Sequence, residues 1–103
     1  MKIERTNVYI KWFEKLKDHR AKGFITKRLV RIENDGNLGE VRSLGGGVSE
    51  IKIDYGSGYR LYYTMRGSDI ILLLIGADKN RQEEDIKRAK EMVKQLKKER
   101  LNG

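Results

Sequence analysis

Apolar and polar side chains alternate along two runs of the segment Val48–Arg66, and a glycine-rich turn separates these runs. A period of two is typical of a half-buried antiparallel strand, so the segment predicts a β-hairpin with one polar face. The polar side chains of both strands share this face only if the loop holds an odd number of residues, and a three-residue loop at Tyr55–Ser57 meets this condition. Lys52 then lies beside Arg60, where two like charges predict either acidic neighbours or a bound anion. The alternative is an ordinary sheet face in contact with water.

Apolar residues at helical spacing, capping residues and further β-type runs define the other elements. We expect strands at Lys2–Arg5, Glu40–Leu44 and Asp69–Ala77, one helix after the cap Thr6, a second helix from the cap Asp18 to about Asn34–Gly36, and a last helix from Gln82 to Arg100. This order predicts an α+β fold, in which an N-terminal helical hairpin packs on a mainly antiparallel sheet of four to five strands and a C-terminal helix follows. No linker or repeat divides residues 1–103, so we expect a single domain.

Aromatic and aliphatic residues of the two N-terminal helices are the expected core against the sheet. Trp12, Phe13, Phe24 and Ile25 fall on the apolar stripes of these helices and should line this core. The run Ile70–Ile75 is apolar on both faces, which predicts a strand that lies away from the sheet edge and is covered on both faces. The last helix is the natural cover for one face, or else a mobile element that a partner displaces.

The charge balance and the amino-acid inventory limit the class of function. The chain has 23 Lys and Arg against 15 Asp and Glu, a formal net charge of +8, so the partner expected first is nucleic acid, ahead of an acidic membrane surface or an acidic protein. There is no cysteine, and the single histidine, His19, falls at the expected junction between two helices. A thiolate metal site and a nuclease built on a histidine pair are therefore excluded, and we expect neither a metal nor a cofactor. No signal-peptide pattern is present and Ile70–Ile75 is too short to span a bilayer, which predicts a cytoplasmic protein.

The chemistry that these residues leave open is metal-free attack on a phosphodiester. Such a site needs cations at the phosphate, a base for a ribose 2′-OH and an acid for the leaving oxygen. Lys52, Arg60 and Lys79 are the expected cations, and an arginine offers a fixed fork that matches phosphate. Glu50 and Asp85 are the candidate proton carriers.

Aromatic and basic residues near the same hairpin are the candidates for RNA contacts. Tyr59 or Tyr62 would stack on a base, as aromatic rings do in sites for single-stranded RNA. Arg66 continues the polar face of the hairpin, and Arg81 lies in the basic segment after the apolar strand. The glycines of Gly56–Arg60 do not form a nucleotide-binding loop, because the helix and the Lys-Ser/Thr pair that such a loop requires do not follow them.

Four spaced motifs carry a resemblance to a known family. They are Gly36–Glu40, Gly47–Ile53, Gly56–Arg60 and the pattern from Gly76 to Ile86. With these motifs in this order the chain resembles the RelE/ParE toxin superfamily, and more narrowly its HigB-like branch of addiction-module killer proteins. The resemblance implies an α+β fold of the microbial-RNase type and a toxin of a type II toxin–antitoxin pair, which cleaves mRNA on the translating ribosome. It also implies a cognate antitoxin, a small helix-turn-helix protein in this branch.

The resemblance also gives roles to individual residues. Arg60 matches the arginine of the family's G-Y-R strand, which supports the scissile phosphate. Lys52 lies where relatives keep basic residues on the preceding strand. Lys79 and Arg81 fall in the basic segment after the apolar strand, so the resemblance implies that both face the RNA.

The chain departs from the family pattern at two points. Glu50 occupies a place where a lysine can stand, and Asp85 and Ile86 follow the basic segment where relatives place a tyrosine or histidine. These departures leave two alternatives open. ParE-like relatives share the fold and act on DNA gyrase without cutting RNA, while a basic RNA-binding module without toxicity lies outside the toxin class. Retention of the three expected cations on one face favours the mRNA endonuclease.

Overall fold

The computed structural model describes the backbone of residues 1–102 and the side chains of residues 1–99. Its elements are β1 (Ile3–Arg5), α1 (Asn7–Lys15), α2 (His19–Asp35), β2 (Val41–Gly45), β3 (Val48–Ile53), β4 (Tyr59–Arg66), β5 (Asp69–Gly76), the 3-10 helix η1 (Lys79–Arg81) and α3 (Gln82–Asn102). This is the predicted order of elements. Within these residues, no helix combines the length and the apolar character that crossing a membrane requires.

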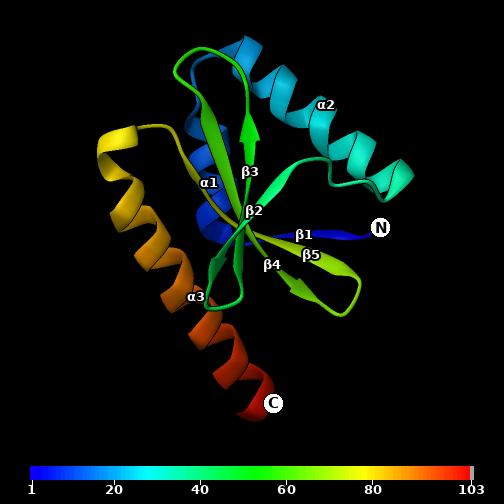
Figure 1. Ribbon diagram of the computed structural model, residues 1–103, viewed down its shortest axis with the longest axis vertical. Coiled ribbons are helices and arrows are strands. Elements are labelled where there is room, and N and C mark those ends of the chain that lie inside the picture. The colour runs from blue at the N-terminus through cyan, green and yellow to red at the C-terminus, as the bar shows by residue number, and fades with distance from the viewer. Residues whose placement is uncertain (103) are drawn as a thin grey trace.

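The strands form one five-stranded sheet in the order β1-β5-β4-β3-β2. The strands from β2 to β5 pair as antiparallel neighbours, and β1 lies parallel to β5. Helices α1 and α2 pack on one face of the sheet and α3 packs on the other (Figure 1). The predicted α+β fold, with a helical hairpin on a mainly antiparallel sheet and a C-terminal helix, is confirmed.

Side-chain caps start both N-terminal helices at the predicted residues. The Oγ1 of Thr6 accepts a hydrogen bond from the backbone N–H of Tyr9 at 3.1 Å and donates one to the carbonyl of Leu73 at 2.6 Å, so the cap also ties α1 to β5. Asp18 accepts hydrogen bonds from the backbone N–H groups of Arg20 and Ala21, in the first turn of α2. Helix α2 ends at Gly36, whose φ of 68° is left-handed and favours glycine.

The core between the helical hairpin and the sheet contains three of the four residues predicted for it. Ile25 is fully buried, and Trp12 and Phe13 are partly buried against the same cluster. The prediction for Phe24 is wrong, because 47% of its surface is exposed. The buried residues of α2 are spaced three or four positions apart and face the sheet; they are Ala21, Ile25, Leu29 and Ile32. Phe24 lies about 100° around the helix from Ile25 and so points away from this face.

The second core lies between the sheet and α3. Val48, Tyr62 and Leu73 of the sheet pack there against Ala89 and Val93 of α3. Strand β5 is buried from Ile70 to Gly76 and lies second from the sheet edge, as its apolar run predicts. In this structure α3 is therefore a cover for the sheet.

The loop of the β3–β4 hairpin has an odd number of residues, as predicted, but it is longer than predicted. Its last pair is Ile53 with Tyr59, which leaves a loop of five residues, 54–58, instead of three. Five is also odd, so Lys52 lies directly opposite Arg60, as predicted. The longer loop is stabilised by a hydrogen bond from Gly58 N–H to the Tyr55 carbonyl at 3.0 Å, with Gly58 at a φ of 91°.

Candidate active site

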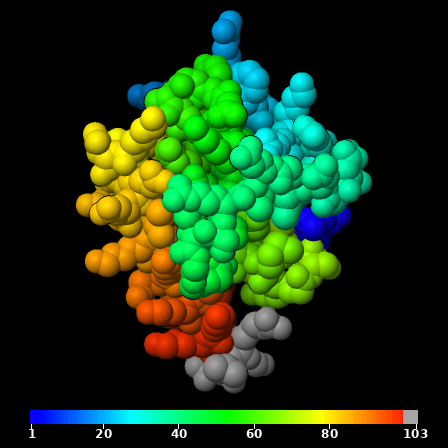
Figure 2. Space-filling view, viewed as in Figure 1, coloured from blue at the N-terminus to red at the C-terminus, as the bar shows by residue number. Residues whose placement is uncertain are grey.

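A hollow of about 600 Å³ opens where β2, β3 and β4 approach the start of α3. Its lining residues are Arg28, Glu40, Val41, Arg42, Glu50, Lys52, Asp54, Arg60 and Gln82. Figure 2 shows the face on which β2, the β3–β4 hairpin and the first turns of α3 adjoin. Four cations and three carboxylates line this hollow, so it offers both charge for an anion and groups that exchange protons.

Strand register brings the polar residues of the hollow together. Arg42, Glu50 and Tyr62 are directly opposed across β2, β3 and β4. The next row, two residues along β3 and on the same face, pairs Lys52 with Arg60. The alternative prediction for this face was an ordinary sheet surface in contact with water. The structure differs, because α3 covers most of the face and Glu50 and Arg60 are buried.

A buried ion pair forms the floor of the hollow. The Nε of Arg60 lies 3.0 Å from Oε1 of Glu50, and only 9% and 6% of the two side chains are exposed. Glu50 is thus the acidic neighbour that the row of like charges predicts. Among the described residues, Oε2 of Glu50 is buried without a hydrogen-bond partner. Removing either charge would leave the other buried and uncompensated.

Tyr62 lies opposite Glu50 on β4, and it also adjoins Asp85, which belongs to the first turn of α3 and is not among the residues that line the hollow. A Cβ at Gly76 would lie 2.9 Å from Oδ2 of Asp85 and 3.4 Å from the hydroxyl of Tyr62, so both polar groups face the same glycine. Burial, reinforced by the charges of Glu50 and Asp85, raises the pKa of Tyr62 to about 12. Burial also raises the pKa of Asp85 above its usual 3.8, although Arg81 opposes the rise. The cluster therefore favours the protonated forms of both groups.

The remaining predicted cations are exposed, and of these Lys52 lines the hollow, whereas Lys79 and Arg81 are not among its lining residues. The side chain of Lys52 is 56% exposed, and its Nζ lies 3.8 Å from Oδ1 of Asp54. Lys79 and Arg81 belong to η1, directly before Gln82 of the lining, and Arg81 pairs with Glu84 at 3.5 Å. These charges can move, because long exposed side chains are held weakly by such pairs.

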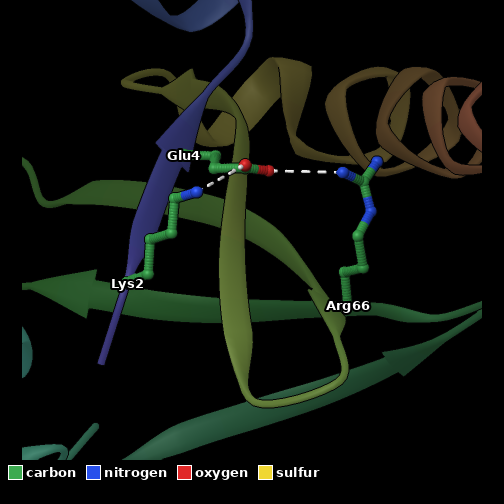
Figure 3. A network of polar contacts seen from close by, with 3 residues as sticks. All are labelled: Lys2, Glu4 and Arg66. Carbon is green, nitrogen blue, oxygen red and sulfur yellow. Dashed lines mark hydrogen bonds and ion pairs between the residues drawn. The ribbon is translucent and has the colours of Figure 1, made fainter.

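The structure does not bring all predicted RNA contacts to the hollow. Tyr62 has no exposed surface, so its ring is not available to stack on a base. Arg66 lies near the far end of β4, where its Nη1 is 3.4 Å from Oε2 of Glu4 on β1 (Figure 3). Lys2 pairs with the same carboxylate at 3.5 Å. Tyr59 packs edge-on against Trp12, with its ring centroid 6.2 Å away.

Sequence reasoning missed several residues that line the hollow. Arg42, Arg28 and Gln82 come from three different elements; Arg42 and Arg28 belong to none of the four motifs, and Gln82 lies in the Gly76–Ile86 pattern without having been assigned a role. Arg42 reaches the polar face because a β-bulge between Ser43 and Gly45 shifts the β2–β3 register. The run Gly45–Gly47 signals a tight turn in the sequence, but a bulge cannot be located from glycines alone.

A comparison with known protein families shows to which family this chain belongs. The family described as "Phage derived protein Gp49-like (DUF891)" matches residues 11–98. The chain belongs to this family. A protein of Haemophilus influenzae, described only as uncharacterized, is 38% identical over 96 residues, which cover 93% of this chain and 96% of that protein.

Solved structures share the fold of this Gp49-like protein at low sequence identity. The isolated RelE toxin of E. coli is 21% identical with a TM-score of 0.60, and the match covers 84% of this chain and 96% of that chain. A chain of the ParDE toxin–antitoxin system of P. aeruginosa gives 18% identity and a TM-score of 0.61, covering 77% and 97%. A chain of the E. coli RelBE toxin–antitoxin complex gives 20% and 0.58, covering 76% and 96%. The likeness to RelE and ParE in fold agrees with the resemblance found in the sequence.

Proposed function

We propose that this Gp49-like protein is the toxin of a type II toxin–antitoxin pair, that it belongs to the HigB-like branch, and that it cleaves mRNA on the ribosome. The whole chain would form one toxin domain, and its partners would be a small helix-turn-helix antitoxin, the ribosome and mRNA. Structures of RelE and of toxin–antitoxin complexes with the same fold support the class.

One observation carries the proposal of RNA cleavage. Glu50 contacts Arg60 at its Nε, while Arg60 lines the hollow. Among the described side chains, those of residues 1–99, neither terminal guanidinium nitrogen of Arg60 donates a hydrogen bond. The two terminal nitrogens form the fork that binds phosphate oxygens in pairs. A scissile phosphate in the hollow would therefore meet an arginine that is already oriented.

The residues around this arginine supply the remaining roles. The 2′-oxygen of the ribose attacks the phosphorus, its proton passes to Glu50, and a 2′,3′-cyclic phosphate forms as the 5′-oxygen leaves. Asp85 is the proposed acid that protonates this leaving oxygen, because burial favours its protonated form. Lys52 and Lys79 add positive charge, which would stabilise the charge that develops on the phosphate.

Expression of the chain alone in a bacterial host, with mapping of mRNA 5′ ends, tests this function. The wild type should arrest growth and create new 5′ ends in translated mRNA. Arg60→Lys keeps a charge beside Glu50 but loses the fork, so cleavage should fall roughly 100- to 1000-fold. Lys52→Ala should lower cleavage less, because its ammonium is mobile. Lys97→Ala, an exposed lysine far along α3, is the matched control.

The alternatives predict different results in the same experiment. Growth arrest with unchanged 5′ ends and altered plasmid supercoiling would support the ParE-like action on gyrase. Binding of RNA without growth arrest would support the RNA-binding module. Either result for the wild type would contradict the endonuclease proposal. A loss of cleavage in a variant is interpreted only if that variant melts at the temperature of the wild type.

A further inference from the structure

Phe24 and Tyr55 form an aromatic pair on the outer surface, outside the hollow described above. Phe24 of α2 is 47% exposed. Its ring centroid lies 4.9 Å from that of Tyr55, which belongs to the β3–β4 loop, and the two planes are inclined by 31°. Figures 1 and 2 show this loop beside the first turns of α2 at the top of the molecule. A single exposed phenylalanine is common, but two rings fixed against each other form a flat apolar surface.

The orientation of Tyr55 is fixed by a hydrogen bond. Its hydroxyl donates to Oδ1 of Asp18 at 3.1 Å, and the same oxygen caps α2. The ring is also partly buried against the core of the helical hairpin. A ring that is held in this way loses little conformational freedom when a ligand stacks on it or on its neighbour Phe24, so the pair is preorganised.

Cations surround the aromatic pair and lead from it to Arg60. One shallow hollow is lined by Arg20, Gly23, Phe24, Lys27 and Tyr55. A second is lined by Phe24, Lys27, Arg28, Arg31, Ile53 and Asp54. The two hollows share Phe24 and Lys27, and the second shares Arg28 and Asp54 with the hollow at Arg60. The three hollows are therefore neighbours in a row along α2 and the β3–β4 loop.

The charge of this surface selects the kind of ligand. Four cations and the single carboxylate of Asp54 line the two outer hollows. Arg28 is further held in place, because its Nη2 donates to the Leu38 carbonyl at 3.2 Å. Sites for single-stranded nucleic acid combine a positively charged groove for the backbone with aromatic rings on which bases stack. An acidic protein would match the positive charge. It would not explain why the aromatic pair, the cations and the proposed phosphate site at Arg60 follow one another along the surface.

We propose that Phe24 and Tyr55 are a base-stacking platform, and that Arg20, Lys27, Arg28 and Arg31 guide a single-stranded RNA from this platform to Arg60. The platform binds a nucleotide that flanks the scissile one, so it contributes affinity without touching the reacting atoms. The inference rests on RNA being the substrate at Arg60. Binding of RNA that cannot be cleaved tests it separately from cleavage.

The experiment measures fluorescence anisotropy of the purified full chain with 2′-O-methyl RNA, which lacks the attacking hydroxyl. An RNA of about ten nucleotides is long enough to reach both sites, because single-stranded sites span about 4 to 16 nucleotides. Phe24→Ala should weaken its binding roughly 5- to 150-fold, the range for loss of one stacked base, and Phe24→Trp should restore the affinity. A dinucleotide analogue that fills only the Arg60 hollow should bind wild type and Phe24→Ala equally.

Val30→Ala is the matched control, because Val30 lies on the same helix, is 49% exposed, and lines a different hollow. Lys27→Ala and Arg31→Ala should each lower the slope of log affinity against log salt by about 0.7, the value for one phosphate contact of a single strand. Lys97→Ala should leave this slope unchanged.

Three results would overturn the proposal. Equal losses of affinity in Phe24→Ala and Val30→Ala would reduce the platform to a nonspecific apolar surface. A loss for the dinucleotide analogue as large as for the long RNA would show that Phe24 acts through the Arg60 hollow. Unchanged RNA affinity together with weaker binding of a partner protein would make this surface a protein interface instead.

Discussion

The Nε of Arg60 lies 3.0 Å from Oε1 of Glu50, on the neighbouring strand beneath α3. The alternating pattern places Arg60 on the solvent side of a strand, where its loss would hardly affect stability. The structure differs, because α3 buries that face and leaves the two charges to compensate each other.

Arg60→Ala should therefore lower the free energy of unfolding by about 3 to 5 kcal/mol, since it leaves the Glu50 carboxylate buried and unpaired. Replacing both residues, as Glu50→Leu with Arg60→Met, should recover most of this loss, because no buried charge remains. Urea denaturation of the two variants and the wild type measures the effect. A wild-type midpoint for Arg60→Ala would show that the pair is open to water in solution.

The raised pKa of Asp85 predicts a dependence of stability on pH. Burial favours its protonated form, so its contribution to stability is fully present below pH 3.8 and is lost as the pH rises through the higher pKa of the folded state. Asp85→Asn removes this titration. The stability of wild type minus that of Asp85→Asn should therefore fall as the pH is raised from below 3.8 towards neutrality. Thermal melting of both proteins over this pH range checks the sign, and a rising difference would contradict it.

Gly76→Ala should destabilise the fold by about 1 to 3 kcal/mol, the usual cost of overpacking a core. The added Cβ would lie 2.9 Å from Oδ2 of Asp85 and 3.0 Å from Cε2 of Tyr62, and the Tyr62 ring is fully buried and cannot move aside. The control is Gly23→Ala, whose Cβ meets nothing within 4 Å on α2, and which should gain about 0.5 to 1 kcal/mol. Chemical denaturation of both variants distinguishes close packing at Gly76 from a general effect of alanine.

Arg66→Ala should leave RNA cleavage and RNA affinity unchanged. Its partner is Glu4, and its side chain does not line the hollow at Arg60 (Figure 3). Stability should fall by about 0.2 to 1 kcal/mol, because the pair is more than one-third exposed and screened by water. Cleavage assays at equal protein concentration check this, and a tenfold loss would return Arg66 to the RNA contacts.

Local patterns predicted the elements, and long-range packing decided the site. The caps Thr6 and Asp18 and the pairing of Lys52 with Arg60 depend on a few neighbouring residues, so the sequence was sufficient to predict them. The burial of Glu50 depends on where α3 packs on the sheet, and no residue of the hairpin predicts the position of α3. Arg42 was missed for a similar reason, since a bulge set its register.

Phe24 illustrates the limit of a periodicity argument. An apolar residue one position from the true stripe of a helix satisfies a loose helical pattern as well as a core residue does. Phe24 is 47% exposed and contacts Tyr55 of the β3–β4 loop, a long-range contact that helical spacing does not predict. The same residue that was wrongly assigned to the core is the one that points to a ligand surface.

The parallel pairing of β1 with β5 has a consequence for the newly made chain. Ile3 of β1 pairs with Ile70 of β5, so β1 has no partner until the ribosome has made β5. At about 5 to 20 residues per second, this wait lasts roughly 3 to 13 s. During that time the apolar stripe of α2 lacks the part of its cover that β5 supplies, so apolar surface stays exposed on the nascent chain until synthesis of β5 is complete.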